Sequence, residues 1–181
     1  MKKIPVIVGL FILLTALFQS CEVENCPPNA LSFAHFTLVD QYGRQLATTV
    51  PTSVYGTTKA DVVIQGTLPD GSIGDVTVHD SLLIDTLINK ESNLKSFKVP
   101  LSYGEETTYI IDYDGKQRDY IRLKHRNIPY FMNIDCGTMM YHEVTEATVS
   151  QGIDSIIIIN PNIDNYEKEN FKIYFTVADN Q

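Results

Sequence analysis

The chain has 181 residues and carries 22 acidic against 14 basic side chains, so its formal net charge is −8. This length supports one domain with a sizeable hydrophobic core. The acidic balance argues against nucleic acid as a partner, because neutralising a phosphate backbone needs a basic surface.

Residues 1–20 predict an export signal. Lys2 and Lys3 form a positive head, residues 4–18 form an apolar run of 15 residues, and Ser20 precedes Cys21. This order is typical of a cleaved signal, and the run is shorter than the ~20 apolar residues of a membrane-spanning helix. The cysteine at this position resembles the lipid attachment site of bacterial lipoproteins. An ordinary cleaved signal with a chance cysteine is the alternative.

Acylation of Cys21 predicts a protein held in the cell envelope by an N-terminal lipid. We expect the outer membrane and leave the periplasmic and surface leaflets open. Residues 21–30 form a polar tether that contains Pro27-Pro28, whose fixed backbone angles make it semi-rigid. Residues 31–178 are expected to form the single folded domain.

Two further cysteines, Cys26 and Cys136, lie in the exported part of the chain. Oxidising conditions outside the cytoplasm favour a disulfide between them. The alternative is two free thiols or a redox pair, but the two lack the Cys-x-x-Cys spacing that redox chemistry uses.

From residue 31 onward the pattern predicts β-strands, with no sustained helical period. Apolar and polar residues alternate, and turn dipeptides separate the runs. The predicted strands cover residues 36–39, 54–55, 62–68, 76–87 and 97–101, then a hairpin over 107–126, then 130–136, 140–150, 153–160 and 171–177. Asp114-Gly115 predicts a two-residue turn for the hairpin, and Gln151-Gly152 is expected to join the next strand pair.

Two strands carry a more specific expectation. Pro100 suits an edge strand, because proline cannot donate to a neighbouring strand. The four isoleucines at residues 156–159 predict a central strand covered on both faces. About nine short strands with frequent turns indicate an all-β fold, a two-sheet antiparallel sandwich of immunoglobulin-like type, with a small closed β-barrel as the alternative.

Three short segments of the carboxyl half carry a family resemblance: Asp135-Cys136-Gly137, residues 153–161 and residues 172–175. Together with the signal they resemble an uncharacterised family of short Bacteroidota lipoproteins. That family has no established activity, so the resemblance implies an envelope location and a β fold and transfers no catalytic residue.

Patterns that indicate chemistry are weak. The four histidines have no metal-ligand spacing, so each is interpreted as a surface or core imidazole; they are His35, His79, His125 and His142. Residues 112–119 mimic the start of a calcium loop but lack its third acidic position and its distant glutamate. We expect no metal and no cofactor, and a non-catalytic binding or structural module for another envelope component. A hydrolase or transferase with a site assembled from loops is the alternative.

One charged pattern suggests a docking surface. Five residues of the hairpin's return strand are spaced by two, which places them on one face of a strand; they are Arg118, Tyr120, Arg122, Lys124 and Arg126, here called the basic stripe. With a two-residue turn, Tyr109 falls opposite Tyr120 and Ile111 opposite Arg118. The stripe is interpreted either as a solvated outer face paired with acidic neighbours or as a docking site for an anionic envelope component such as lipid A phosphates, a phospholipid headgroup or an acidic protein.

Overall fold

The computed structural model describes residues 26, 31–134, 136–166 and 168–177. Within this part of the chain the regular structure is β-strand. The strands are β1 (Phe33–Asp40), β2 (Thr52–Thr67), β3 (Ile73–Glu91), β4 (Ser96–Pro100), β5 (Glu106–Tyr113), β6 (Gln117–Asn133), β7 (Gly137–Val149), β8 (Ser155–Ile158), β9 (Asn162–Ile163) and β10 (Phe171–Phe175).

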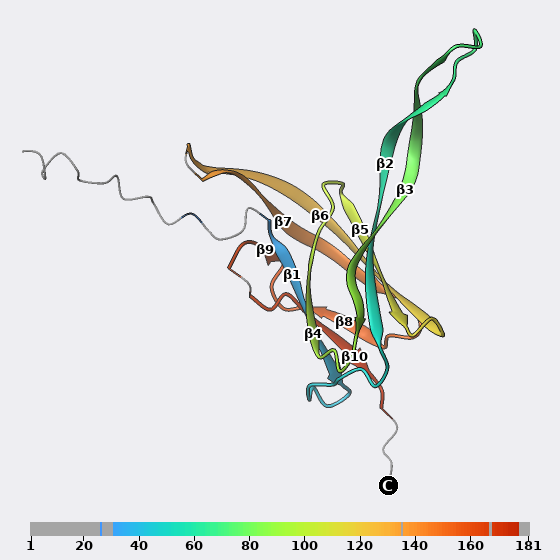
Figure 1. The fold of residues 1–181 in the computed structure, drawn as a ribbon. Helices are drawn as coiled ribbons and strands as arrows, with labels where there is room; N and C mark the ends of the chain where they lie inside the picture. The colour runs from blue at the N-terminus through green and yellow to red at the C-terminus, as the bar shows by residue number, and fades with distance from the viewer. Residues whose placement is uncertain (1–25, 27–30, 135, 167, 178–181) are drawn as a thin grey trace, which may run out of the picture.

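The strands form two open sheets that face each other, so the predicted sandwich is confirmed and the closed barrel is not (Figure 1). One sheet has the order β4-β1-β10-β8 and the other the order β3-β2-β5-β6-β7-β9. Neighbouring strands are antiparallel except β1 and β10, which run parallel. This pairing places Phe36, near the start of the described chain, beside Phe171, near its end.

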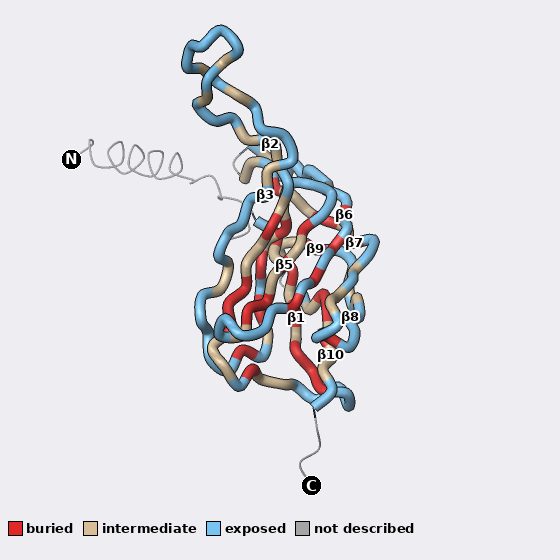
Figure 2. Tube along the Cα trace, turned by 90° about the vertical axis from the view of Figure 1, so that its right-hand side faces the viewer, coloured by how far each residue is buried: buried red, intermediate tan, exposed pale blue. Residues whose placement is uncertain are grey.

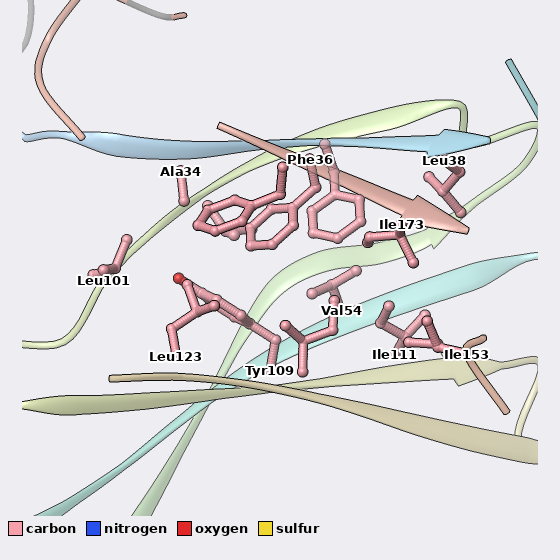
Figure 3. Packing of buried hydrophobic residues seen from close by; sticks show 14 of the residues in the cluster. Ala34, Phe36, Leu38, Val54, Leu101, Tyr109, Ile111, Leu123, Ile153 and Ile173 are labelled. Atoms are coloured by element: carbon pink, nitrogen blue, oxygen red, sulfur yellow. The ribbon is translucent and has the colours of Figure 1, made fainter. Parts of the chain in front are cut away.

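The core between the sheets is centred on Phe36. Its ring stacks between Phe97 of β4 and Phe171 of β10, with ring centroids 4.8 and 4.6 Å away. Tyr109 of the opposite sheet meets the Phe36 ring edge-on at 5.5 Å and donates its hydroxyl proton to the carbonyl of Pro100 at 2.9 Å. Aromatic residues of both sheets therefore close the sandwich (Figure 3).

The two sheets differ greatly in strand length. The strands of the four-stranded sheet have 4 to 8 residues, whereas β2, β3, β6 and β7 have 13 to 19. At ~3.4 Å per residue the long strands cannot be covered along their whole length. The β2–β3 hairpin and the far end of the β6–β7 hairpin accordingly project from the body (Figure 1), and the projecting part of β2 and β3 is largely exposed (Figure 2).

Two pairs of predicted short strands are in fact single long strands. The predicted strand 54–55 and all but the last residue of the predicted strand 62–68 lie in β2, and the return strand of the predicted hairpin and the first part of the predicted strand 130–136 lie in β6. Pro129 does not interrupt β6, because β5 pairs with β6 only as far as Lys124. Beyond that point β6 has one hydrogen-bonded neighbour, β7, and a proline is tolerated on the open side.

The predicted β5–β6 hairpin exists, but its predicted register is wrong. Tyr113 pairs with Gln117, so the loop has three residues, with Asp114 and Gly115 both at positive φ. The extra residue shifts the pairing by one: Tyr120 lies opposite Ile110 and Arg118 opposite Asp112. Because a shift of one exchanges the faces of a strand, Tyr109 and Ile111 lie in the core and not beside the basic stripe.

The predictions for the region around the four isoleucines are also wrong. β7 and β8 belong to different sheets, so the turn at residues 151–152 joins the two layers and does not form a hairpin. β8 is an edge strand, and Ile157 is exposed while Ile156 and Ile158 are half-buried. β4, with Pro100 at its end, is an edge strand as predicted.

The Phe36 cluster predicts a large stability loss on truncation. Phe36→Ala removes a fully buried ring and should lower the free energy of unfolding by about 3–5 kcal/mol, measured by urea denaturation. Ile73→Ala, at an exposed position of β3, is the control and should change it by less than about 0.5 kcal/mol. Equal effects of the two substitutions would show that the stack does not hold the sheets together.

Candidate functional site

The basic stripe forms as a single exposed face of β6. All five of its residues are exposed, while the intervening Asp119, Ile121, Leu123 and His125 are buried. The strand therefore separates charge from core along its first ten residues, as the spacing predicted.

Every basic side chain of the stripe has a carboxylate partner. Two of the pairs join β6 to β5: Arg118 Nε lies 2.7 Å from Asp112 Oδ2, and Arg122 Nε lies 3.4 Å from Glu106 Oε1. The other two join β6 to β7: Lys124 Nζ lies 2.8 Å from Glu146 Oε2, and Arg126 pairs with Glu143.

These ion pairs change the electrostatics of the stripe. The hydrogen bond from Arg118, aided by the backbone N–H of Gly115, lowers the pKa of the Asp112 carboxyl, and the hydrogen bond to Glu146 raises the pKa of Lys124. Four cations face four anions, so an anionic ligand would have to displace the carboxylates. The pairing of all four cations with carboxylates is what the solvated-face interpretation predicts. Docking of an anionic envelope component at the stripe stays a prediction.

The structure brings together a polar network that the sequence spacing did not reveal. His125 of β6 and His142 of β7 both direct Nδ1 at Asn127 Oδ1, at 3.0 and 2.7 Å. Asn127 in turn donates its amide protons to the carbonyls of Tyr103 and Gly104. The amide oxygen must therefore face the imidazoles, so each Nδ1 carries a proton.

The network also includes Thr107, which lies 2.9 Å from His125 Nε2. A hydroxyl, an imidazole and an amide within hydrogen-bond reach are the parts of a nucleophile–base arrangement. Here Thr107, His125 and His142 are all buried, and Asn127 anchors the loop at residues 103–104. Burial lowers the pKa of His125 and lowers that of His142 to about 4, so both imidazoles are neutral. The network fixes the loop to the β6–β7 hairpin.

A sequence signal for this network existed. His125 shares the core-facing parity of Ile121 and Leu123 on β6, which indicated a buried imidazole. Its partner His142 could not be found in the same way, because it depends on the cross-strand pairing of Asn127 with His142.

One cavity holds a buried carboxylate. A space of about 370 Å³ lies between residues 46–50, Tyr113 and Phe175, and Asp119 forms part of its wall. Ser150 Oγ donates to Asp119 Oδ1 at 2.7 Å, and the carboxylate lies close against the backbone of Gly152. Asp119 is thus engaged by the loop between β7 and β8. No group of three or more histidine, cysteine or acidic side chains suited to a metal ion occurs among the described residues.

The disulfide predicted from the exported location is present. Cys26 and Cys136 are bonded, with Cα atoms 5.3 Å apart, within the span that a disulfide permits. Cys136 lies at the turn between β6 and β7, so the bond attaches the tether to the tip of this hairpin. Cys21, the signal at 1–20 and the rest of the tether lie outside the described residues. The described part of the chain has no helix with the length and hydropathy needed to cross a bilayer.

The projecting β2–β3 hairpin, here called the arm, spans residues 58–83. It exposes six large apolar side chains, which are Val63, Ile64, Ile73, Val78, Leu82 and Leu83. Beyond Thr57 the strands of the arm pair only with each other. The arm also leaves the outer edge of β3 open, since β3 ends the sheet. Such an apolar, unpaired surface is typical of an interaction site.

Comparisons with known proteins identify one relationship. A family model described as "Family of unknown function (DUF6452)" matches residues 75–175, which is more than half of the chain. No curated protein and no solved structure matches the chain.

The buried histidines predict a loss of stability in acid. The pKa of His142 is about 4 in the folded protein and about 6.5 in the unfolded chain, so the unfolded state binds more protons between these values. The free energy of unfolding should therefore fall as the pH drops from 7 to 5, with His142 contributing at most about 2 kcal/mol. Urea denaturation at both pH values measures this loss.

The variant His142→Gln should lose less stability than the wild type over the same pH range. The control is His79→Gln, which replaces an exposed histidine of the arm and leaves both buried imidazoles in place. An unchanged pH dependence in His142→Gln would contradict the assignment of a neutral, buried His142.

Proposed function

We propose that this chain, which belongs to the family of unknown function DUF6452, is a lipid-anchored protein of the cell envelope with a non-catalytic binding role. In this proposal Cys21 carries the lipid, the outer membrane holds the lipid, and the arm contacts another envelope protein. The exposed apolar surface of the arm is the observation that carries the binding role.

The proposed anchor draws on the N-terminal sequence and on the disulfide. The positive head, short apolar run and small residue before Cys21 fit an export signal with a lipidated cysteine. The Cys26–Cys136 bond fits an oxidising compartment outside the cytoplasm. Cleavage before Cys21 removes Lys2 and Lys3 and leaves 12 basic against 22 acidic side chains, so electrostatic attraction to an anionic membrane contributes little.

The shape of the arm supports its proposed role. A two-stranded ribbon is marginal by itself in water, so the arm exposes apolar side chains without gaining a core of its own. Leu82 pairs with Lys59 across the ribbon, and Leu83 pairs with Thr58, so apolar groups emerge on both faces. The open edge of β3 adds backbone donors and acceptors that a partner strand could use. The positive φ of Asp80 near the middle of this edge distorts it locally, which limits pairing to part of β3.

The enzyme alternative requires titratable groups in an open cleft. The Thr107–His125–Asn127 set has suitable distances but lies in the interior and serves the loop at 103–104. Asp119 borders a cavity but is engaged by Ser150. The binding role therefore has the stronger support.

The anchor is tested by metabolic labelling with a clickable palmitate. Wild-type protein should be labelled and Cys21→Ser should not, because the acyl chains need the Cys21 thiol or the amino group that cleavage exposes. Equal labelling of the two proteins would contradict the proposed anchor. Export and folding of the variant are checked by formation of the Cys26–Cys136 bond on non-reducing peptide mapping.

The binding role is tested with a photo-reactive amino acid placed in cells at Val63 or Leu82, both exposed on the arm, and at Ile157, exposed on β8. The two arm positions should cross-link to the same envelope protein, identified by mass spectrometry, and Ile157 should not. Cross-linking that is equal at all three positions, or absent from the arm, would show that the arm is not the binding surface.

A further inference from the structure

The far end of the β6–β7 hairpin is a second exposed apolar surface. It comprises Ile128, Tyr130, Phe131, Met132 and Ile134, all exposed, and is here called the apolar tip. Ile134 is 92 % exposed and Phe131 61 %. Residues 127–134 contain no charged side chain; the next one in the sequence is Asp135, which lies outside the described residues.

The apolar tip is exposed along β6, whereas β7 opposite it is partly covered: Met139 is buried, and Asn165 contacts the side chains of Met139 and Tyr141. From Arg118 to Arg126 one face of β6 lies on the core and the other carries the basic stripe. β5 ends its pairing at Lys124, and beyond it β6 pairs only with β7. The stacking of Tyr130 on Tyr141, with ring centroids 5.2 Å apart, stiffens the ribbon but leaves Tyr130 exposed.

The disulfide determines which part of the domain lies nearest to the anchor. Four residues lie between Cys21 and Cys26, so the five Cα–Cα steps of an extended chain span at most about 18 Å. Cys26 is bonded to Cys136, beside the apolar tip. Without this bond, the next described residue held to the domain is Ser32, which is buried and donates to the carbonyl of Met140; it lies 11 positions after Cys21, a reach of about 40 Å.

We propose that the apolar tip contacts the phospholipid bilayer in which the Cys21 lipid is anchored, with Phe131 and Ile134 at the boundary between headgroups and acyl chains. This inference rests on the proposed lipid anchor. Phe131 and Ile134 can bury their wholly apolar side chains at this depth, and Tyr130 can bury its ring there while its hydroxyl stays hydrated. The contact is apolar and not electrostatic, since the chain is acidic overall.

The two hairpins are oriented so that the apolar tip can contact the bilayer while the arm contacts a partner protein. The arm and the β6–β7 hairpin diverge from the body in different directions (Figure 1). A domain held to the bilayer by the apolar tip therefore leaves the arm accessible to a partner protein. The lipid alone would fix the position of the chain but not the orientation of the domain; the tip supplies a second point of contact.

The chain contains no tryptophan, so a single introduced indole reports on its own surroundings. Phe131→Trp is made in the full-length acylated protein, with Ile157→Trp on β8 as the matched control, since both positions are exposed. Each protein is reconstituted into vesicles of phosphatidylcholine whose acyl chains are brominated or unmodified. Bromine at the acyl chains should lower the fluorescence of Phe131→Trp about twofold or more and leave that of Ile157→Trp nearly unchanged.

A Cys136→Ser substitution added to Phe131→Trp tests whether the disulfide holds the apolar tip close to the lipid anchor. Quenching should then weaken, because the reach from Cys21 to the next residue held to the domain rises from about 18 to about 40 Å. Quenching that is as strong as with the bond intact would overturn this part of the inference.

Mass spectrometry of the same preparations separates this inference from the proposed function. If Cys21 carries no acyl chains, the proposed anchor is wrong. If Cys21 is acylated and Phe131→Trp is quenched no more than Ile157→Trp, the anchor holds and the contact of the apolar tip with the bilayer is wrong.

Discussion

The stack of Phe36 between Phe97 and Phe171 is the contact on which the sandwich depends. It aligns three strands of the smaller sheet, and Tyr109 brings the larger sheet against them. Because the smaller sheet has strands of at most 8 residues, the core that it can cover is short. The strands of the larger sheet can extend beyond this core, because their cross-strand hydrogen bonds hold the long hairpins together. The mismatch in length is therefore the physical origin of both projecting surfaces.

The charged and apolar parts of β6 follow from the same mismatch. Where β5 and β7 both flank it, β6 has one face on the core and an outer face on which ion pairs with Glu106, Glu143 and Glu146 compensate the basic side chains. Exposed pairs of this kind add little to stability, but their charged groups keep the outer face hydrated. Where β5 is absent the pattern ends, and the side chains become apolar and uncharged.

The alternation of residues and the turn dipeptides were sufficient to predict the β character of the chain, the sandwich and the exposed face of the basic stripe, but not the full length of β2 and β6. They could not predict which strands pair. The prediction of a two-residue turn at Asp114-Gly115 was wrong because Lys116 also belongs to the loop. The loop length is set by the pairing of Tyr113 with Gln117, which the dipeptide alone does not determine. The prediction of a central strand for the isoleucines at 156–159 was wrong. Whether a strand lies at the edge or the centre of a sheet depends on neighbouring strands that are distant in sequence. The histidine network was missed because His142 meets Asn127 only through cross-strand register.

The arm and the apolar tip have similar composition, yet the structure favours different occupants for them. The tip is bonded to Cys26, which lies five positions after Cys21, so a bilayer that holds Cys21 is always within its reach, at a high effective concentration. The arm belongs to a hairpin that no disulfide joins to the tether, and its open β3 edge offers hydrogen-bonding groups that hydrocarbon cannot satisfy. β6 is also open on one side beyond Lys124, but a tip that reaches only the boundary between headgroups and acyl chains keeps this edge hydrated. The short connection to Cys21 through the disulfide, and not the apolar side chains, therefore distinguishes the surface for lipid from the surface for a protein partner.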